Sequence, residues 1–213
     1  MKILGITLAR GGSKSVPNKN IKLVNNKPLI DYTISEALKS KYLTQYIVST
    51  DNETIRSIAM ECGASVPFLR PAELSSDTAS SVSALQHAVK FMERIDCDSY
   101  DYIIELMCTN PLKNVFDIDF CIEKLIKTKA DSVIAVHRLL DNHPSRIKKI
   151  ENDKIVDFCV SETPESRRQD LEPKAFIRSG SIYALRRDYL MKEGRRYGSI
   201  ESRPYVLPSD RAV

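Results

Sequence analysis

The chain has 213 residues, of which 42% are hydrophobic and 28% are charged, a balance that fits one folded α/β domain and excludes a disordered chain. Its 32 basic and 28 acidic residues give a net charge of +4, an excess too small and too dispersed to indicate nucleic-acid binding. No stretch approaches the roughly 18 apolar residues of a membrane span, and the apolar start of the chain is too brief for a signal peptide.

The first third of the chain alternates predicted strands with predicted helices. Apolar runs at residues 3–8 and 46–49 indicate buried strands. A helix is predicted to begin at Pro28, because the apolar residues that follow recur on one face. A capping box at 50–53, beginning at Thr50, predicts the start of a second helix, and Gly63 fits the C-terminal cap of that helix.

The same alternation continues to about residue 136. The further predicted elements are strands at 65–68, 102–107 and 132–136, a helix capped by Ser80 or Ser81, and a helix around 118–126. Strands that alternate with helices in this way predict a mostly parallel sheet with helices on both faces.

The pattern changes after about residue 140. Apolar stretches at 147–150 and 155–160 flank an Asn-Asp turn and predict a β-hairpin, residues 161–175 are polar, and another strand is predicted at 181–185. The hairpin has alternating apolar residues and little sequence left to cover them. We therefore expect it to contact a partner, and the protein to be a homodimer.

Cysteine and histidine do not indicate a metal or disulfide framework. The five cysteines are odd in number, widely spaced and without a CxxC pair, so we expect reduced thiols, mostly in the core, and a cytoplasmic protein. His87, His137 and His143 have no second ligand at metal-binding spacing and are expected to be structural.

The segment directly after the first strand is rich in groups that bind phosphate. Gly11 and Gly12 could adopt positive φ and bring backbone N–H groups close to a ligand, although a Gly-Gly pair alone is typical of a surface turn. Three cations and a hydroxyl accompany them: Arg10, Lys14, Lys19 and Ser13. The spacing is neither that of a Walker loop nor that of a dinucleotide fingerprint, which disfavours a kinase or dehydrogenase and favours another nucleoside triphosphate enzyme.

Seven blocks of the sequence, in order, resemble the acylneuraminate cytidylyltransferases, the CMP–sialic acid synthetase family. The first is ARGGSK followed by PNKN, and the others lie at 48–51, 67–71, 77–81, 109–112, 167–170 and 180–183. The resemblance implies a Rossmann-like three-layer α/β/α sandwich, a single domain over residues 1–213, with an arm at about 140–175 for dimerisation or substrate contact. It also implies transfer of CMP from CTP, with Mg²⁺, to an acidic nonulosonate such as N-acetylneuraminate or legionaminate. A 3-deoxy-octulosonate cytidylyltransferase and an inert nucleotide-binding module remain alternatives.

The resemblance also assigns site residues. The implied nucleotide-binding residues are Arg10, Gly11, Gly12, Ser13, Lys14, Asn20, Arg70, Ser80 and Ser81. Catalytic roles fall on Arg10, Lys14 and Arg168, whose charges suit phosphate and carboxylate groups. The implied sugar-binding residues are Met107, Thr109, Asn110, Gln169, Ser179 and Tyr183.

The chain departs from the family at three places. Met107 and Ser179 stand where amide side chains are usual, so we expect altered recognition of the N-acyl group and a preference for a relative such as legionaminate. In the family, the sequence at 205–213 leads into a metal-binding aspartate and a final helix. We therefore expect the natural protein to continue for roughly 15–25 residues, the length of one more ordinary helix. The metal ligands stay unidentified, and Asp210 lies too early in the match to replace that aspartate.

Overall fold

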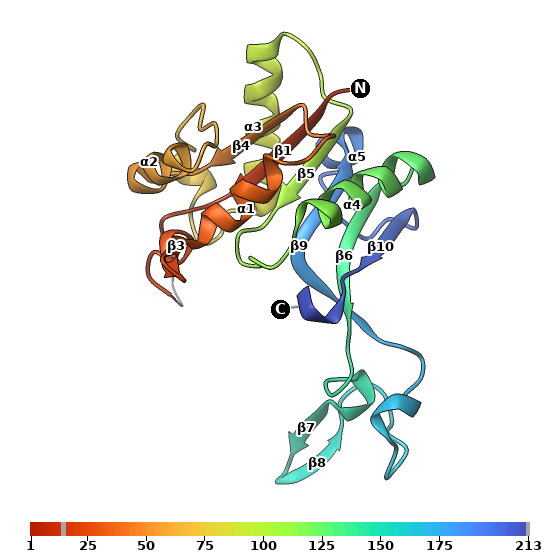
Figure 1. Ribbon diagram of the computed structural model, residues 1–213. Coiled ribbons are helices and arrows are strands. Elements are labelled where there is room, and N and C mark those ends of the chain that lie inside the picture. The colour runs from red at the N-terminus through yellow and green to blue at the C-terminus, as the bar shows by residue number, and fades with distance from the viewer. Residues whose placement is uncertain (14–15, 212–213) are drawn as a thin grey trace.

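A six-stranded mixed sheet runs through the molecule in the order β10-β6-β9-β5-β1-β4 (Figure 1). The computed structural model describes residues 1–13 and 16–211. The strands of the sheet are β1 (Ile3–Leu8), β4 (Gln45–Ser49), β5 (Tyr102–Leu106), β6 (Ser132–Arg138), β9 (Phe176–Arg186) and β10 (Ser202–Val206). β1 pairs in parallel with β4 and β5, and β10 pairs in parallel with β6, whereas β9 is antiparallel to both of its neighbours. The predicted mostly parallel sheet is confirmed.

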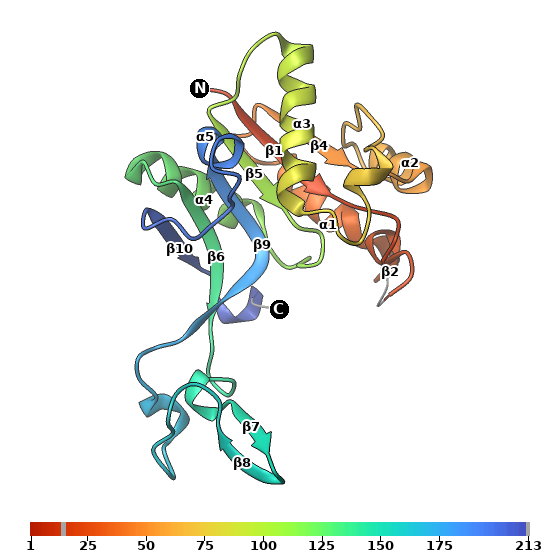
Figure 2. The ribbon, with the colours of Figure 1, turned by 180° about the vertical axis from the view of Figure 1, so that it is seen from behind.

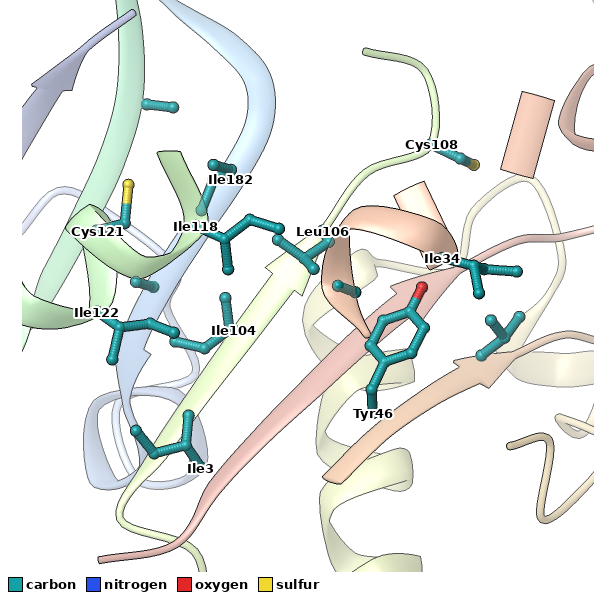
Figure 3. Packing of buried hydrophobic residues seen from close by; sticks show 14 of the residues in the cluster. Ile3, Ile34, Tyr46, Ile104, Leu106, Cys108, Ile118, Cys121, Ile122 and Ile182 are labelled. Carbon is teal, nitrogen blue, oxygen red and sulfur yellow. The ribbon is translucent and has the colours of Figure 1, made fainter. Parts of the chain in front are cut away.

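Helices cover both faces of the sheet, as predicted (Figures 1 and 2). One face carries α1 (Leu29–Ala37), α2 (Glu53–Glu61) and α4 (Val115–Thr128), and the other carries α3 (Ser81–Asp96) and α5 (Arg187–Met191). Alternation along β1 divides its side chains between two cores, because Ile3 packs under α1 and α4 while Leu4 and Ile6 face α3. Figure 3 shows the first core, in which Ile104 of β5 lies beside Ile118 and Ile122 of α4.

The start of α2 differs from the predicted capping box. Thr50 forms a parallel bridge with Leu69, so it is still extended, and its hydroxyl accepts a hydrogen bond from Asn52 N at 3.2 Å. Asn52 is the N-cap instead, and its Oδ1 accepts from Ile55 N at 3.0 Å. The predicted end is confirmed, because Gly63 follows the last turn with φ 92°.

The predicted strand at 65–68 is reduced to isolated bridges. Ser65 pairs with Ile47 and Leu69 pairs with Thr50, but no ladder forms between them. Pro67 stands in this segment and has no backbone N–H to donate, which prevents a continuous ladder beside β4. The helix predicted next does form, and Ser80 is its N-cap.

Two elements at the C-terminal end exceed the prediction. β9 has 11 residues rather than the five predicted, and it joins the two halves of the sheet. β10 was not predicted, because its sequence SRPYV contains an arginine and a proline. An edge strand tolerates both, since Pro204 lies in a strand that pairs on one side only, with β6.

The segment between β6 and β9 extends away from the sheet (Figures 1 and 2). It contains the predicted hairpin of β7 (Lys148–Glu151) and β8 (Lys154–Asp157), whose turn residues Asn152 and Asp153 have φ 50° and 61°. A second Asn-rich turn, not predicted, joins β2 (Leu23–Val24) to β3 (Lys27–Pro28). Short 3₁₀ helices are η1 (Lys19–Ile21), η2 (Ala72–Leu74), η3 (Pro144–Arg146), η4 (Arg168–Asp170) and η5 (Ser209–Arg211).

All five cysteines are free thiols, but the expectation that most lie in the core is wrong. Cys108 and Cys121 are buried and Cys62 is half-buried, whereas Cys97 and Cys159 are exposed in a helix end and in the arm. Among the helices of the described residues, none combines the length and the apolar character needed to cross a bilayer.

A buried lysine lies beneath the carboxyl end of the sheet. Lys113 is 1% exposed, and its Nζ donates to Thr33 Oγ1, Met107 O and Asn110 O at 2.6 to 2.7 Å. These acceptors are neutral, and burial lowers the pKa of Lys113 to about 7. The lysine therefore holds the loop after β5 in place at an electrostatic cost.

The pKa of Lys113 predicts a specific pH dependence of stability. In the unfolded chain this lysine keeps a pKa near 10, so between about pH 7 and pH 10 the unfolded state binds more protons and the free energy of unfolding rises with pH. Lys113→Met removes this contribution. In urea titrations at about pH 7 and pH 10, we expect the parent to gain stability relative to the variant as the pH rises. A difference that does not change with pH would show that the lysine titrates normally.

Candidate functional site

A polar cavity of about 470 Å³ lies beyond the carboxyl ends of β1 and β5. Its walls are the loop after β1, the segment 70–81, the N-terminus of α3 and the residues that follow β5. Eight residues predicted for the site line it: Arg10, Ser13, Asn20, Arg70, Ser80, Ser81, Met107 and Thr109. The edge of the sheet predicted to bind the ligand is therefore the edge that is hollowed.

The reason for glycine in the loop after β1 differs from the predicted one. Neither Gly11 nor Gly12 has positive φ, and the Gly11 N–H already donates to Asp51 Oδ1 at 2.9 Å. Gly11 is required by close approach instead, because a Cβ there would lie 2.9 Å from Asn52 Nδ2. A Cβ built on Gly12 would meet no atom of residues 1–13 and 16–211 within 4 Å, so the packing of the described residues does not demand glycine at that position.

Arg10 connects two walls of the cavity. Its guanidinium donates to Ser76 O at 3.1 Å and lies 3.3 Å from Asp77 Oδ1, with about a third of the side chain exposed. The group therefore stands at the cavity surface, where an anionic ligand can replace its present partners. Lys14, the other predicted phosphate ligand, lies outside the described residues.

Arg70 is a buried cation in the cavity wall. Its side chain is 4% exposed, Nε donates to Ser75 Oγ at 2.9 Å, and Nη2 lies 4.0 Å from Asp51 Oδ1. Burial lowers the pKa of Arg70 within a range in which it stays protonated. A cation this poorly solvated interacts strongly with a phosphate or a base carbonyl that enters the cavity.

Asn20 lies in the cavity wall, but both polar atoms of its side-chain amide form hydrogen bonds within the protein. Nδ2 donates to Arg10 O at 3.0 Å, and Oδ1 accepts from Cys108 Sγ at 3.1 Å. The side chain thus joins the loop after β1 to the residues after β5. Its visible role is to hold the two walls together, and contact of Asn20 with a nucleotide stays a prediction.

The N-terminus of α3 opens onto the cavity through two serines. Ser80 caps the helix, and its Oγ accepts from Ser83 N at 3.0 Å. Ser81 is the first residue of α3, which has 16 residues in all. The N-terminus of such a helix favours negative charge, so this wall suits a phosphate or another acidic group.

The predicted sugar residues are only partly brought together. Met107 and Thr109 line the cavity, whereas Asn110 and Tyr183 are buried and do not line it. Neither amide atom of Asn110 has a partner among the described residues. Ser179 belongs to β9, and its Oγ donates to Ala135 O of the neighbouring strand β6 at 3.0 Å. Its hydroxyl is therefore bonded within the sheet.

Two further predicted residues lie in the arm. Arg168 and Gln169 belong to η4, and the Arg168 guanidinium is about half exposed and 3.3 Å from Asp141 Oδ2. The arm extends away from the sheet (Figure 1). Neither residue is part of the cavity lining of its own chain. Sequence similarity could group them with the site but could not place them in space.

Two important residues of the site were not assigned from sequence. Asp51 binds the glycine loop and faces Arg70, and Glu105 lines the cavity while its Oε2 accepts from Arg196 at 2.6 Å. Burial raises the pKa of Glu105, while Arg196 opposes that rise. The signals available in the sequence were the place of Asp51 in the family block at 48–51 and a glutamate within the apolar run 102–107.

The carboxylates around the cavity do not form a metal cage. Within residues 1–13 and 16–211, no three His, Cys, Asp or Glu side chains gather closely enough to hold a metal ion. Asp77 and Glu105 each face an arginine, and Asp210 is exposed next to Arg211. The three histidines are also absent from the cavity wall, and His143 is buried with its ring nitrogens bonded to Ser145 Oγ and Pro173 O. The described residues thus do not supply a complete Mg²⁺ site.

Sequence comparison finds similar proteins among the cytidylyltransferases. Residues 4–198 match the family model described as cytidylyltransferase. The pseudaminic acid cytidylyltransferase of Campylobacter jejuni is 34% identical over 98% of this chain and 88% of its own length. The CMP-N,N′-diacetyllegionaminic acid synthase of Legionella pneumophila is 35% identical over the same shares.

A solved structure shows the same fold. The CMP:2-keto-3-deoxy-manno-octonic acid synthetase in complex with CTP superposes with a TM-score of 0.71, covering 97% of this chain and 90% of that one, at 19% identity. At this identity the likeness establishes the architecture alone, which confirms the predicted Rossmann-like sandwich. The sequence matches carry the further conclusion: this chain belongs to the cytidylyltransferase family, as its resemblance to the acylneuraminate cytidylyltransferases predicted.

Proposed function

We propose that this enzyme transfers CMP from CTP to an acidic nonulosonate sugar and releases pyrophosphate. The observation that carries the proposal is the polar cavity at the carboxyl edge of the sheet, walled by Arg10, buried Arg70 and the N-terminus of α3. The names of two relatives, which act on pseudaminic and legionaminic acids, support this acceptor class.

The reaction needs positioning and neutralisation of charge more than covalent chemistry. A hydroxyl oxygen of the sugar bonds to the α-phosphorus, the bond to the β-phosphate bridging oxygen breaks, and the hydroxyl proton leaves to a base. Arg10 would exchange Asp77 for a phosphate oxygen, and Arg70 would stabilise the nucleotide from its buried place. Both arginines then face negative charge that grows on pyrophosphate as it departs.

We infer that CTP is used together with Mg²⁺, whose charge would offset that of the phosphate groups. Mg²⁺ commonly keeps several waters and uses few protein carboxylates when it accompanies nucleotides. The carboxylates of the described residues do not gather around one point, so they do not form a protein site for this ion by themselves.

We further propose that the arm forms a homodimer. Ile150 and Ile155, which are opposite residues of β7 and β8, are each 78% exposed, and Phe158 is 60% exposed, so the hairpin presents large apolar side chains to solvent. A second copy would cover that surface. Arg168 and Gln169 lie on the same arm, and in a dimer they would be free to serve the partner's cavity.

Arg10→Ala should reduce kcat/KM for CTP by roughly 10- to 100-fold, because a charge-assisted hydrogen bond to phosphate is lost. Lys14→Ala should behave similarly. The matched control is Arg56→Ala, whose guanidinium pairs with Glu53 on the surface of α2. Release of pyrophosphate measures all three, and near-parent activity of both loop variants would place the phosphates elsewhere.

Ile150→Asp combined with Ile155→Asp should convert the homodimer to a monomer, because two charges would have to be buried at the interface. Light scattering at micromolar concentration measures the mass. Phe116→Asp is the matched control, since Phe116 is also 78% exposed but lies on α4, away from the arm. A parent that is itself monomeric would refute the dimer.

The acceptor preference follows from the departures at Met107 and Ser179. Met107 offers the cavity an apolar side chain, and the Ser179 hydroxyl is engaged with Ala135 O. We expect a higher kcat/KM with N,N′-diacetyllegionaminate than with N-acetylneuraminate in a pyrophosphate-release assay. Equal or better efficiency with N-acetylneuraminate would contradict this expectation. Activity with 3-deoxy-octulosonate alone would favour the eight-carbon alternative, and CTP binding without turnover would favour an inert module.

A further inference from the structure

A buried ion pair forms part of the cavity wall. Glu105 is 1% exposed, and its Oε2 accepts from Arg196 Nη1 at 2.6 Å. The Arg196 guanidinium also lies 4.7 Å from the centre of the Tyr183 ring. Glu105 and Tyr183 are opposite residues of β5 and β9, so one sheet face presents both to Arg196.

The pair stands between two adjoining hollows. Glu105 lines the main cavity, while Arg196 lines a second hollow of about 320 Å³ formed by the start of α3 and residues 194–197. Ser80 and Ser81 line both hollows, so the second continues from the first across the N-terminus of α3. A transferase with two substrates needs two such neighbouring spaces.

The charges assign the two spaces to different substrates. Arg10, Arg70 and Lys19 line the main cavity, which suits the triphosphate. A phosphate placed against the Glu105 carboxylate would be repelled, so the end of the cavity at Glu105 suits the other substrate. The adjoining hollow carries Arg195 and Arg196 beside the serine hydroxyls, and it is rich in hydrogen-bond donors.

The ion pair keeps unused hydrogen-bonding capacity. Arg196 Nη1 binds Oε2, whereas Glu105 Oε1 has no hydrogen-bond partner within the described part of the chain. Several N–H groups of Arg196 are also uncommitted there. A carboxylate oxygen next to guanidinium N–H groups matches an amide, whose N–H donates to the first and whose carbonyl accepts from the second.

We propose that Glu105 and Arg196 are specificity-determining residues that bind an acylamino substituent of the acceptor sugar. This inference rests on the proposed function, because it concerns the acceptor of that reaction. The pair would favour a sugar with an acetamido group over the same sugar with a hydroxyl in its place. Recognition of this kind discriminates strongly, since a sugar without the amide leaves the buried charges with unmet hydrogen bonds.

The test compares two acceptors that differ in one substituent: N-acetylneuraminate and its analogue with a hydroxyl in place of the acetamido group. The ratio of their kcat/KM values is measured for the full chain and for Glu105→Leu combined with Arg196→Leu. Replacement of both members by apolar residues avoids an unpaired buried charge, and thermal unfolding verifies the fold. Glu105→Gln is a second variant that keeps the shape of the side chain and the contact to Arg196.

We expect the double variant to lower the ratio at least about tenfold, and Glu105→Gln to lower it less, with KM for CTP within about twofold of the parent. The matched control is Glu93→Gln, since Glu93 pairs with Arg187 at 2.7 Å and lines neither hollow. An unchanged ratio in an active double variant would overturn this inference alone. A raised KM for CTP, or weaker discrimination of CTP from UTP, would also overturn this inference, because it would show that Glu105 contacts the cytosine ring of CTP. A parent inactive with every nonulosonate would overturn the proposed function, and this inference with it.

Discussion

The carboxylate of Asp51 holds two walls of the cavity at once. It accepts a hydrogen bond from the backbone of Gly11 and lies 4.0 Å from the guanidinium of Arg70. The loop after β1 can approach α2 this closely only because Gly11 has no side chain to strike Asn52. The position of Arg10 follows directly, since it is the residue before Gly11. Removal of the Asp51 carboxylate would therefore release the loop and leave Arg70 buried without an opposite charge.

Two ion pairs of different kinds belong to the cavity wall. Asp77 and Glu105, two carboxylates in its wall, face Arg10 and Arg196 respectively. Such pairing offsets part of the positive charge that Arg10, Lys19 and Arg70 bring to the cavity wall, but the two pairs differ in burial. Arg10 and Asp77 are partly exposed, so solvent screens their attraction and phosphate can compete for the arginine. Glu105 is almost completely buried, and its attraction to Arg196 persists. The first pair is suited to exchange and the second to a fixed recognition surface.

The fold could be predicted where local pattern and tertiary environment agree. β1, the helix cap at Ser80 and the hairpin with its Asn-Asp turn arose as expected because each depends on residues close in sequence. The failures depend on distant neighbours. β10 forms because the edge of β6 is available to a strand that carries Pro204, and β9 lengthens because it has partners on both sides. No periodicity within those segments reports the presence of a neighbouring strand.

The sequence alone determined the residue types of the site, their order along the chain and the family to which they belong. It did so because a run of glycines, cations and hydroxyls directly after a strand is a local pattern, which is visible without the fold. Tertiary structure decided which of them share one cavity: Arg70 and Met107 do, whereas Arg168 lies on the arm and Ser179 faces the sheet. It also introduced Asp51 and Glu105, whose roles depend on Gly11 and Arg196, 40 and 91 residues away. Contacts across such separations form only when the sheet aligns the carboxyl ends of its strands, and no local pattern records that alignment.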